Sequence, residues 1–215
     1  MLQEMLFKAL KETIYMVSIS TILSILLAFI PAIILIVTDD RGLKPNKIVY
    51  KSLDFVVNLL RSFPFIILMV AILPFTKSII GKTIGTTAAI VPLTIAAIPF
   101  ATRVLESAMK EVDEGVIEAA KSLGASDIQI IFKVIIKESM PSMIMAITLT
   151  VISVVGCSAM AGAVGGGGLG DVAIKYGYYR FQTDIMIYTV IILIILVQVI
   201  QSLGNILYKK LNKQS

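Results

Sequence analysis

The sequence contains no histidine and only one cysteine, Cys157. These two absences exclude a disulfide framework and any metal site built from cysteine and histidine. Charged residues are also scarce, at 15% of the 215 residues, and no Walker motif for binding nucleotide phosphates is present. We therefore expect neither a catalytic site nor a bound cofactor or metal ion in this chain.

Apolar residues dominate what remains. They make up 57% of the sequence, and the mean hydropathy is +0.93. A chain with long uncharged apolar runs cannot bury them all in a soluble domain. The net charge of +5 would suit nucleic acid if the basic residues were clustered, but they lie between the apolar runs. Basic residues between apolar runs set the orientation of a protein in a membrane. We therefore expect the chain to lie in lipid and not to bind nucleic acid.

Five apolar segments are long enough to cross a bilayer. They cover about residues 14–37, 55–75, 84–102, 143–164 and 185–207. No internal repeat or domain boundary separates them, so residues 1–215 are predicted to form one all-α membrane domain. The glycine-rich residues 162–170 follow a membrane helix rather than a strand, and we expect a flexible loop there instead of a phosphate-binding loop.

Basic residues predict the orientation of these spans. About thirteen of the nineteen Lys and Arg residues fall in the first loop, the long central loop, the C-terminal tail and the edges beside them. These parts are therefore predicted to be cytoplasmic, with the N-terminus outside and the C-terminus inside.

The central loop, residues 110–141, also reads as a small folded unit. Residues 116–123 have helical spacing, and Gly124 follows where a helix can end in a left-handed residue. Ser126 and Gln129 have the spacing of a capping box that starts a second helix. The spacing of Ile128, Ile131, Phe132 and Ile135 predicts its apolar stripe. Two short helices joined at Gly124 form a knob that can dock in a partner's groove.

This loop is where the chain resembles a family. The run Glu118-Ala119-Ala120, followed after three residues by Gly124, resembles the EAA loop of permease subunits of ABC importers. The resemblance implies that this cytoplasmic loop is the coupling helix that plugs into the ATPase subunit. The coupling residues it implies are Glu118, Ala119, Ala120, Gly124, Ala125 and Ser126. The alternative is that Glu118 is a solvated helical residue paired with Lys121.

Three further stretches look like the methionine-importer permeases, a group of type I ABC importers. They are residues 61–76, 88–109 and 158–178. The resemblance implies a homodimer in a bacterial cytoplasmic (inner) membrane, joined by two ABC ATPase subunits that bind the ATP. It also implies an extracytoplasmic methionine-binding protein or lipoprotein that delivers D- or L-methionine.

Four residues are candidates for the pathway itself. The fourth expected span is rich in small residues, among them Gly156 and Ser158, which let helices approach closely. Met160 lies among them and is either ordinary packing or an apolar constriction that closes the pathway. Arg61, the one ionisable residue in any expected span, either snorkels to headgroups or lines a polar path.

Other functions stay open at this point. The substrate could be another amino acid or a small polar solute. The chain could also act alone as a secondary carrier or channel, although its spans lack the carboxylate such carriers generally use. A membrane scaffold is the remaining alternative, but prolines and glycines inside the third and fourth spans favour a moving pathway.

Overall fold

The computed structural model describes residues 2–212, and every regular element in that range is helical, which confirms the all-α expectation. The helices are α1 (Leu2–Thr38), α2 (Lys47–Arg61), α3 (Phe65–Ala71), α4 (Leu73–Ile80), α5 (Thr86–Lys110), α6 (Glu114–Ser122), α7 (Asp127–Gln129), α8 (Ile136–Glu138), α9 (Met140–Ala163), α10 (Gly168–Val172) and α11 (Thr183–Asn212). Two π-helical turns, η1 (Ile130–Ile135) and η2 (Ala173–Tyr178), join these.

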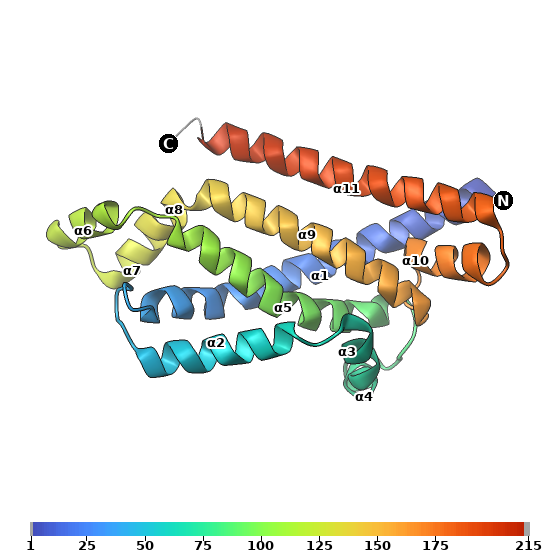
Figure 1. Cartoon of the computed structure of the whole chain (residues 1–215), viewed down its shortest axis with the longest axis horizontal. Helices are drawn as coiled ribbons and strands as arrows, with labels where there is room; N and C mark the ends of the chain where they lie inside the picture. The colour runs from blue at the N-terminus through green and yellow to red at the C-terminus, as the bar shows by residue number, and fades with distance from the viewer. Residues whose placement is uncertain (1, 213–215) are drawn as a thin grey trace.

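The bundle is elongated, with α1, α5, α9 and α11 running along its length (Figure 1). The short helices α6 and α7 project from one end, here called the α6 end, and α10 lies at the other, the α10 end. Helix α1 begins at the α10 end and α11 finishes at the α6 end. Helix α1 packs most extensively on α5, and α9 lies against both α5 and α11.

Four helices are long and apolar enough to cross a membrane, and a fifth crossing requires the pair α2 and α3 to count as one broken span. Residues 55–75, expected as one span, are therefore not one straight helix. The chain bends by 94° between α2 and α3, across Ser62, Phe63 and Pro64. Proline has no backbone N–H and disfavours helical geometry in the residue before it, which accounts for the break.

Several helices extend beyond the apolar runs inside them, α1 and α5 by the largest margins. Helix α1 begins at Leu2 rather than near residue 14, and α5 continues to Lys110 rather than ending near residue 102. Hydropathy marks where charges begin, but a helix continues past that point when its charged side chains find partners. Arg103 and Lys110 both have such partners, as described below.

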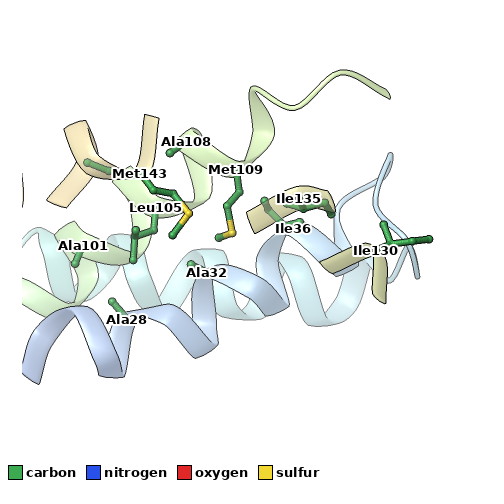
Figure 2. Close-up of a cluster of buried hydrophobic side chains, with 11 residues drawn as sticks. Ala28, Ala32, Ile36, Ala101, Leu105, Ala108, Met109, Ile130, Ile135 and Met143 are labelled. Atoms are coloured by element: carbon green, nitrogen blue, oxygen red, sulfur yellow. The ribbon is translucent and has the colours of Figure 1, made fainter. Parts of the chain in front are cut away.

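The core at the α6 end joins the long helices to the central loop (Figure 2). Small side chains on α1 and α5, such as Ala28, Ala32 and Ala101, let these helices lie close together. Ile130 and Ile135 of η1 are buried in the same cluster as Leu105. A displacement of the central loop must therefore be transmitted to α1 and α5, because well-packed cores do not deform continuously.

The glycine-rich residues 162–170, expected to be a flexible loop, are held in place instead. The backbone N–H of Gly168 donates to Glu12 Oε2, and that of Leu169 donates to Thr13 Oγ1, both at 2.9 Å. The glycines serve close packing, because a side chain on Gly162 would overlap the backbone of α10. This expectation was wrong because composition alone does not distinguish a mobile glycine from one that permits close approach.

Candidate functional site: the central loop and the charges beneath it

Helix α6 begins at Glu114, two residues before the predicted stretch, and ends at Ser122, one residue before its predicted end. Asp113 caps its N-terminus by accepting a hydrogen bond from the Gly115 N–H at 2.7 Å. After the C-cap residue Leu123, Gly124 adopts a positive φ of 79°, which side-chain-bearing residues rarely adopt. The glycine therefore sets the angle at which the chain leaves α6, and the predicted helix and turn are confirmed.

The predicted capping box is also confirmed. The Ser126 N–H donates to Gln129 Oε1 at 2.9 Å, and the Gln129 N–H donates to Ser126 Oγ at 3.4 Å. The predicted apolar stripe is wrong in part, because Ile128 and Phe132 are exposed while Ile130 and Ile135 are buried. The reason is the π-helical turn η1, whose i→i+5 hydrogen bonds widen the helix and place residues five apart on one face.

Two faces of the loop differ in what they contact. Ile117, Ala120 and Ala125 pack inward against the core shown in Figure 2. Four large apolar side chains of the loop instead point to the surface: Val116, Leu123, Ile128 and Phe132, which we call the loop patch. Leu123 is 89% exposed. Exposed apolar side chains gathered on one short segment are typical of a surface that contacts another protein or a membrane.

The residues predicted to mediate coupling lie on or beside this surface. Glu118, Ala119, Gly124 and Ser126 are exposed, whereas Ala120 and Ala125 are partly buried. Within residues 2–212, Glu118 forms no ion pair with Lys121 or any other side chain. The alternative in which the Glu118 carboxylate pairs with Lys121 is therefore not what the structure contains.

A cavity of about 250 Å³ lies beneath α6. Its lining includes Ile117 of α6, Ile36 at the end of α1, Met109 and Lys110 of α5, and Ile135 of η1. Ile117 contacts both this space and the core, so α6 rests on the core at the edge of the cavity.

A buried carboxylate ties α5 to its neighbours at the α6 end. The Glu106 side chain is only 4% exposed and accepts from Arg103 at 2.7 Å and from Lys110 at 2.8 Å. The Tyr50 hydroxyl donates to the same carboxylate at 3.3 Å. Buried charges are tolerated only when they are paired and hydrogen-bonded, as Glu106 is.

Further ion pairs extend this network to the first loop. Arg103 also bonds to Asp54 of α2, and Lys110 bonds to Asp39 at 2.7 Å. Partial burial alone would raise the pKa of the Asp39 carboxyl, but the hydrogen bonds from Lys110 and the Arg41 N–H outweigh it and lower that pKa. Alternating charges therefore join the C-terminal part of α5 to the middle of α2 and to the residue that follows α1.

Removing the buried carboxylate is expected to destabilise the protein. Glu106→Ala leaves Arg103 and Lys110 without their shared partner, and breaking a buried charge network in this way costs about 3–5 kcal/mol. Glu138→Ala, at an exposed glutamate in α8, serves as the matched control and is expected to change stability by less than about 0.5 kcal/mol. Thermal unfolding of both variants in the same detergent measures the difference, and equal midpoints would contradict the structural role of Glu106.

Sequence reasoning missed this network because Glu106 lies beyond the apolar run that marks the third span. A signal was nonetheless present: Arg103, Glu106 and Lys110 follow one another at spacings of three and four, which places them on one face of a helix. Their partners, Asp39 just after α1 and Asp54 on α2, carried no such signal, because their proximity arises only from the packing of α5 against those helices.

The four pathway candidates do not lie together. Gly156 and Met160 are exposed and, four residues apart on α9, share a face. Ser158 is buried, and its hydroxyl donates to the Val155 carbonyl at 2.7 Å. Arg61 is the last residue of α2 and is exposed on the side of the bundle, far along the chain from the others.

Comparison with known proteins adds independent observations. The family model described as "Binding-protein-dependent transport system inner membrane component" matches residues 24–214. A probable D-methionine transport system permease protein MetI from Vibrio cholerae is 50% identical over 209 residues, which cover 97% of this chain and 93% of that protein. The methionine import system permease protein MetP of Bacillus subtilis is 42% identical and covers 97% of this chain and 94% of its own length.

The fold is similar to solved transporters as well. A chain of the MetNI methionine ABC transporter, in its native crystal form with inward-facing conformations, superposes with a TM-score of 0.95 at 39% identity. The match covers 97% of both chains. An amino acid ABC transporter crystallised with histidines superposes with a TM-score of 0.79 at 17% identity, a likeness of fold alone.

Proposed function

The chain belongs to the family of binding-protein-dependent transport system inner membrane components, and we propose that it is the permease subunit of an ATP-driven methionine importer. The observation that carries this proposal is 50% identity, over nearly the whole chain, to a probable D-methionine permease. The near-complete superposition on a chain of the MetNI methionine ABC transporter supports the same function. The substrate proposed is D- or L-methionine, delivered by an extracytoplasmic binding protein or lipoprotein.

The energy for transport comes, on this proposal, from a separate ATPase subunit. The loop patch supplies an exposed apolar surface for docking, and Glu118 adds a free carboxylate beside it. Because η1 and α6 share a core with α1 and α5, a push on the docked loop is carried into the bundle. The role of Gly124 is to hold α6 at the angle that docking requires.

Charge distribution supports an orientation with the α6 end in the cytoplasm. Arg61, the last residue of α2, lies well away from the α6 end and so does not add to the positive charge there. About twelve of the nineteen basic residues remain on the α6 side, which keeps the excess there. Helix α1 then starts outside a bacterial inner membrane, and α11 ends inside it.

Two copies of the chain are proposed to form one pathway with two ATPase subunits. The near-complete superposition on a chain of the MetNI methionine ABC transporter supports such an assembly. Native mass measurement of the complex purified by a tag on this chain tests the stoichiometry. Two permeases with two ATPases are expected, and an active complex with one permease would contradict the proposal.

Met160 is proposed as an apolar constriction where the two copies meet. Its side chain is 46% exposed in the single chain, beside the small Gly156. Met160→Ala is expected to uncouple ATP hydrolysis from uptake or to raise passive leak, because apolar constrictions close pathways by excluding water. Met140→Ala, an exposed methionine at the other end of α9, is the control. If Met160→Ala only lowers protein yield and leaves coupling normal, Met160 is packing rather than a gate.

Growth tests the substrate. A bacterial methionine auxotroph that lacks its own methionine importers should grow on micromolar D- or L-methionine when it carries this permease with its ATPase and binding protein. Growth restored by a different amino acid or a small polar solute, but not by methionine, would support the alternative substrate class. Growth supported by the permease without any ATPase would indicate a stand-alone carrier.

A further inference from the structure

Helix α2 has one polar face and one apolar face. Its polar stripe consists of Lys47, Lys51, Asp54, Asn58 and Arg61, whose alternating spacings of four and three place them in one row. Beside this row, Ile48 and Phe55 are 80% and 66% exposed. Lipid suits the apolar face, but it does not suit a row of charges and amides.

The far end of the polar stripe reaches the middle of the bundle. Asp54 bonds to Arg103 of α5, and α2 and α5 run in opposite directions (Figure 1). Arg61 lies seven residues beyond Asp54, which is roughly 10 Å along the helix. The same distance along α5 from Arg103 leads to about residue 96, near the middle of Thr86–Lys110. Arg61 is therefore at mid-depth, too far from the α6 end for its side chain to reach headgroups there.

The chain beyond Arg61 also requires a polar environment. Ser62, Phe63 and Pro64 form the break between α2 and α3, and all three are exposed in the single chain. Non-helical backbone at membrane depth is stable only where protein buries it or water reaches it. Among residues 2–212, no carboxylate forms an ion pair with Arg61. The guanidinium and the break therefore face a water-filled space or the second copy, not lipid.

We propose that the Asn58 and Arg61 end of the polar stripe lines the translocation pathway and that the Arg61 guanidinium binds the α-carboxylate of the amino-acid substrate on its way through. This rests on the proposed function, which supplies an amino acid as cargo. Arg61 is the one positively charged side chain in the five apolar segments, so it is the one cation there that can attract the carboxylate. A guanidinium binds a carboxylate through two parallel hydrogen bonds, a geometry that lysine cannot reproduce.

Asn58 offers a hydrogen-bond acceptor for the second charged group of an amino acid, its ammonium. Its Nδ2 donates to Asp54 Oδ2 at 3.1 Å, which leaves its Oδ1 oxygen as an acceptor one turn from Arg61 on the same face. That oxygen suits the ammonium of the substrate while the guanidinium holds the carboxylate. The stripe thus recognises the part that all amino acids share, and discrimination between side chains is left to other groups.

Binding to the purified permease–ATPase complex, without its binding protein, tests the inference. Equilibrium binding of radiolabelled L-methionine is compared with that of its amide, which keeps the ammonium but lacks the carboxylate, and binding to the ATPase subunits alone is subtracted. The wild-type complex is expected to prefer methionine. Arg61→Gln is expected to leave binding of the amide unchanged. It is expected to weaken methionine binding at least about tenfold, because the loss of hydrogen bonds to a charged group lowers the affinity by that factor.

Two more variants make the result specific. Lys82→Gln removes the same charge from an exposed residue between α4 and α5 and should keep the wild-type preference. Arg61→Lys keeps the positive charge but loses the planar guanidinium, so it should show a smaller preference for methionine over the amide. This variant provides the test if Arg61→Gln does not assemble. A preference that survives in both Arg61 variants, or is absent from the wild type, overturns the inference. ATP-driven methionine uptake by the same wild-type complex would then still support the proposed function.

Discussion

Replacing Gly124 with valine is expected to abolish both ATP-driven uptake and substrate-stimulated ATP hydrolysis, while the protein still inserts in the membrane. Gly124 has a φ of 79°, and a β-branched residue cannot hold that conformation without strain. The chain would leave α6 at a different angle, and the loop patch would no longer match its docking surface. Glu118→Arg is expected to give the same loss by reversing an exposed charge on the docked face.

Gly81→Val is the matched control for the backbone strain. Gly81 caps α4 with a φ of 80°, and like Gly124 it has open space where a Cβ would be. The two substitutions therefore cost similar strain, but only one of them lies in the central loop. Co-purification of the ATPase should be lost in Gly124→Val and kept in Gly81→Val. Wild-type uptake by Gly124→Val and Glu118→Arg would contradict the coupling role of the loop.

A second large effect is expected at the contact between α9 and α10. A Cβ on Gly162 would overlap the backbone nitrogen of Asp171 and the backbone of Gly170, which cannot rotate away as a side chain would. Gly162→Ala must therefore separate the two helices, and we expect it to destabilise the protein by about 3 kcal/mol, the upper range for overpacking.

Gly156→Ala, in the same helix, should have the opposite effect. Within residues 2–212 of a single chain, no atom outside the adjoining turns of α9 lies within 4 Å of a Cβ built on Gly156, and alanine is favoured over glycine in a helix by about 1 kcal/mol. Thermal unfolding of the two variants in one detergent compares the same chemical change at two places six residues apart. If both variants unfold at the wild-type temperature, α10 does not pack on α9 as described.

The local geometry of the central loop was largely predictable from the sequence. Gly124 and the pair Ser126 and Gln129 act through bonds to residues within a few positions, so their spacing in the sequence determines their geometry. The burial of the next helix was not predictable, because the π-helical turn that exposes Ile128 and Phe132 depends on how η1 fits the core of α1 and α5. Local rules specify where helices begin, and packing decides which side they bury.

Hydropathy identified where the chain meets lipid, but not where its helices break or which charges pair. The bend at Pro64 falls inside an apolar run, so counting apolar residues made one span of 55–75. Glu106 falls just outside a run, and its burial depends on Arg103 and Lys110 neutralising it. Both features require the positions of neighbouring helices, which a single sequence does not contain.

Uptake by the reconstituted complex tests the central claim most directly. The permease and its ATPase are placed in proteoliposomes with the binding protein, and accumulation of radiolabelled methionine is measured with ATP, without ATP, and with a non-hydrolysable ATP analogue. Accumulation that requires hydrolysable ATP, the ATPase and an intact Gly124 is the result this account predicts. Methionine flux that proceeds equally without ATP, or no methionine flux from a fully assembled complex that hydrolyses ATP, would contradict it.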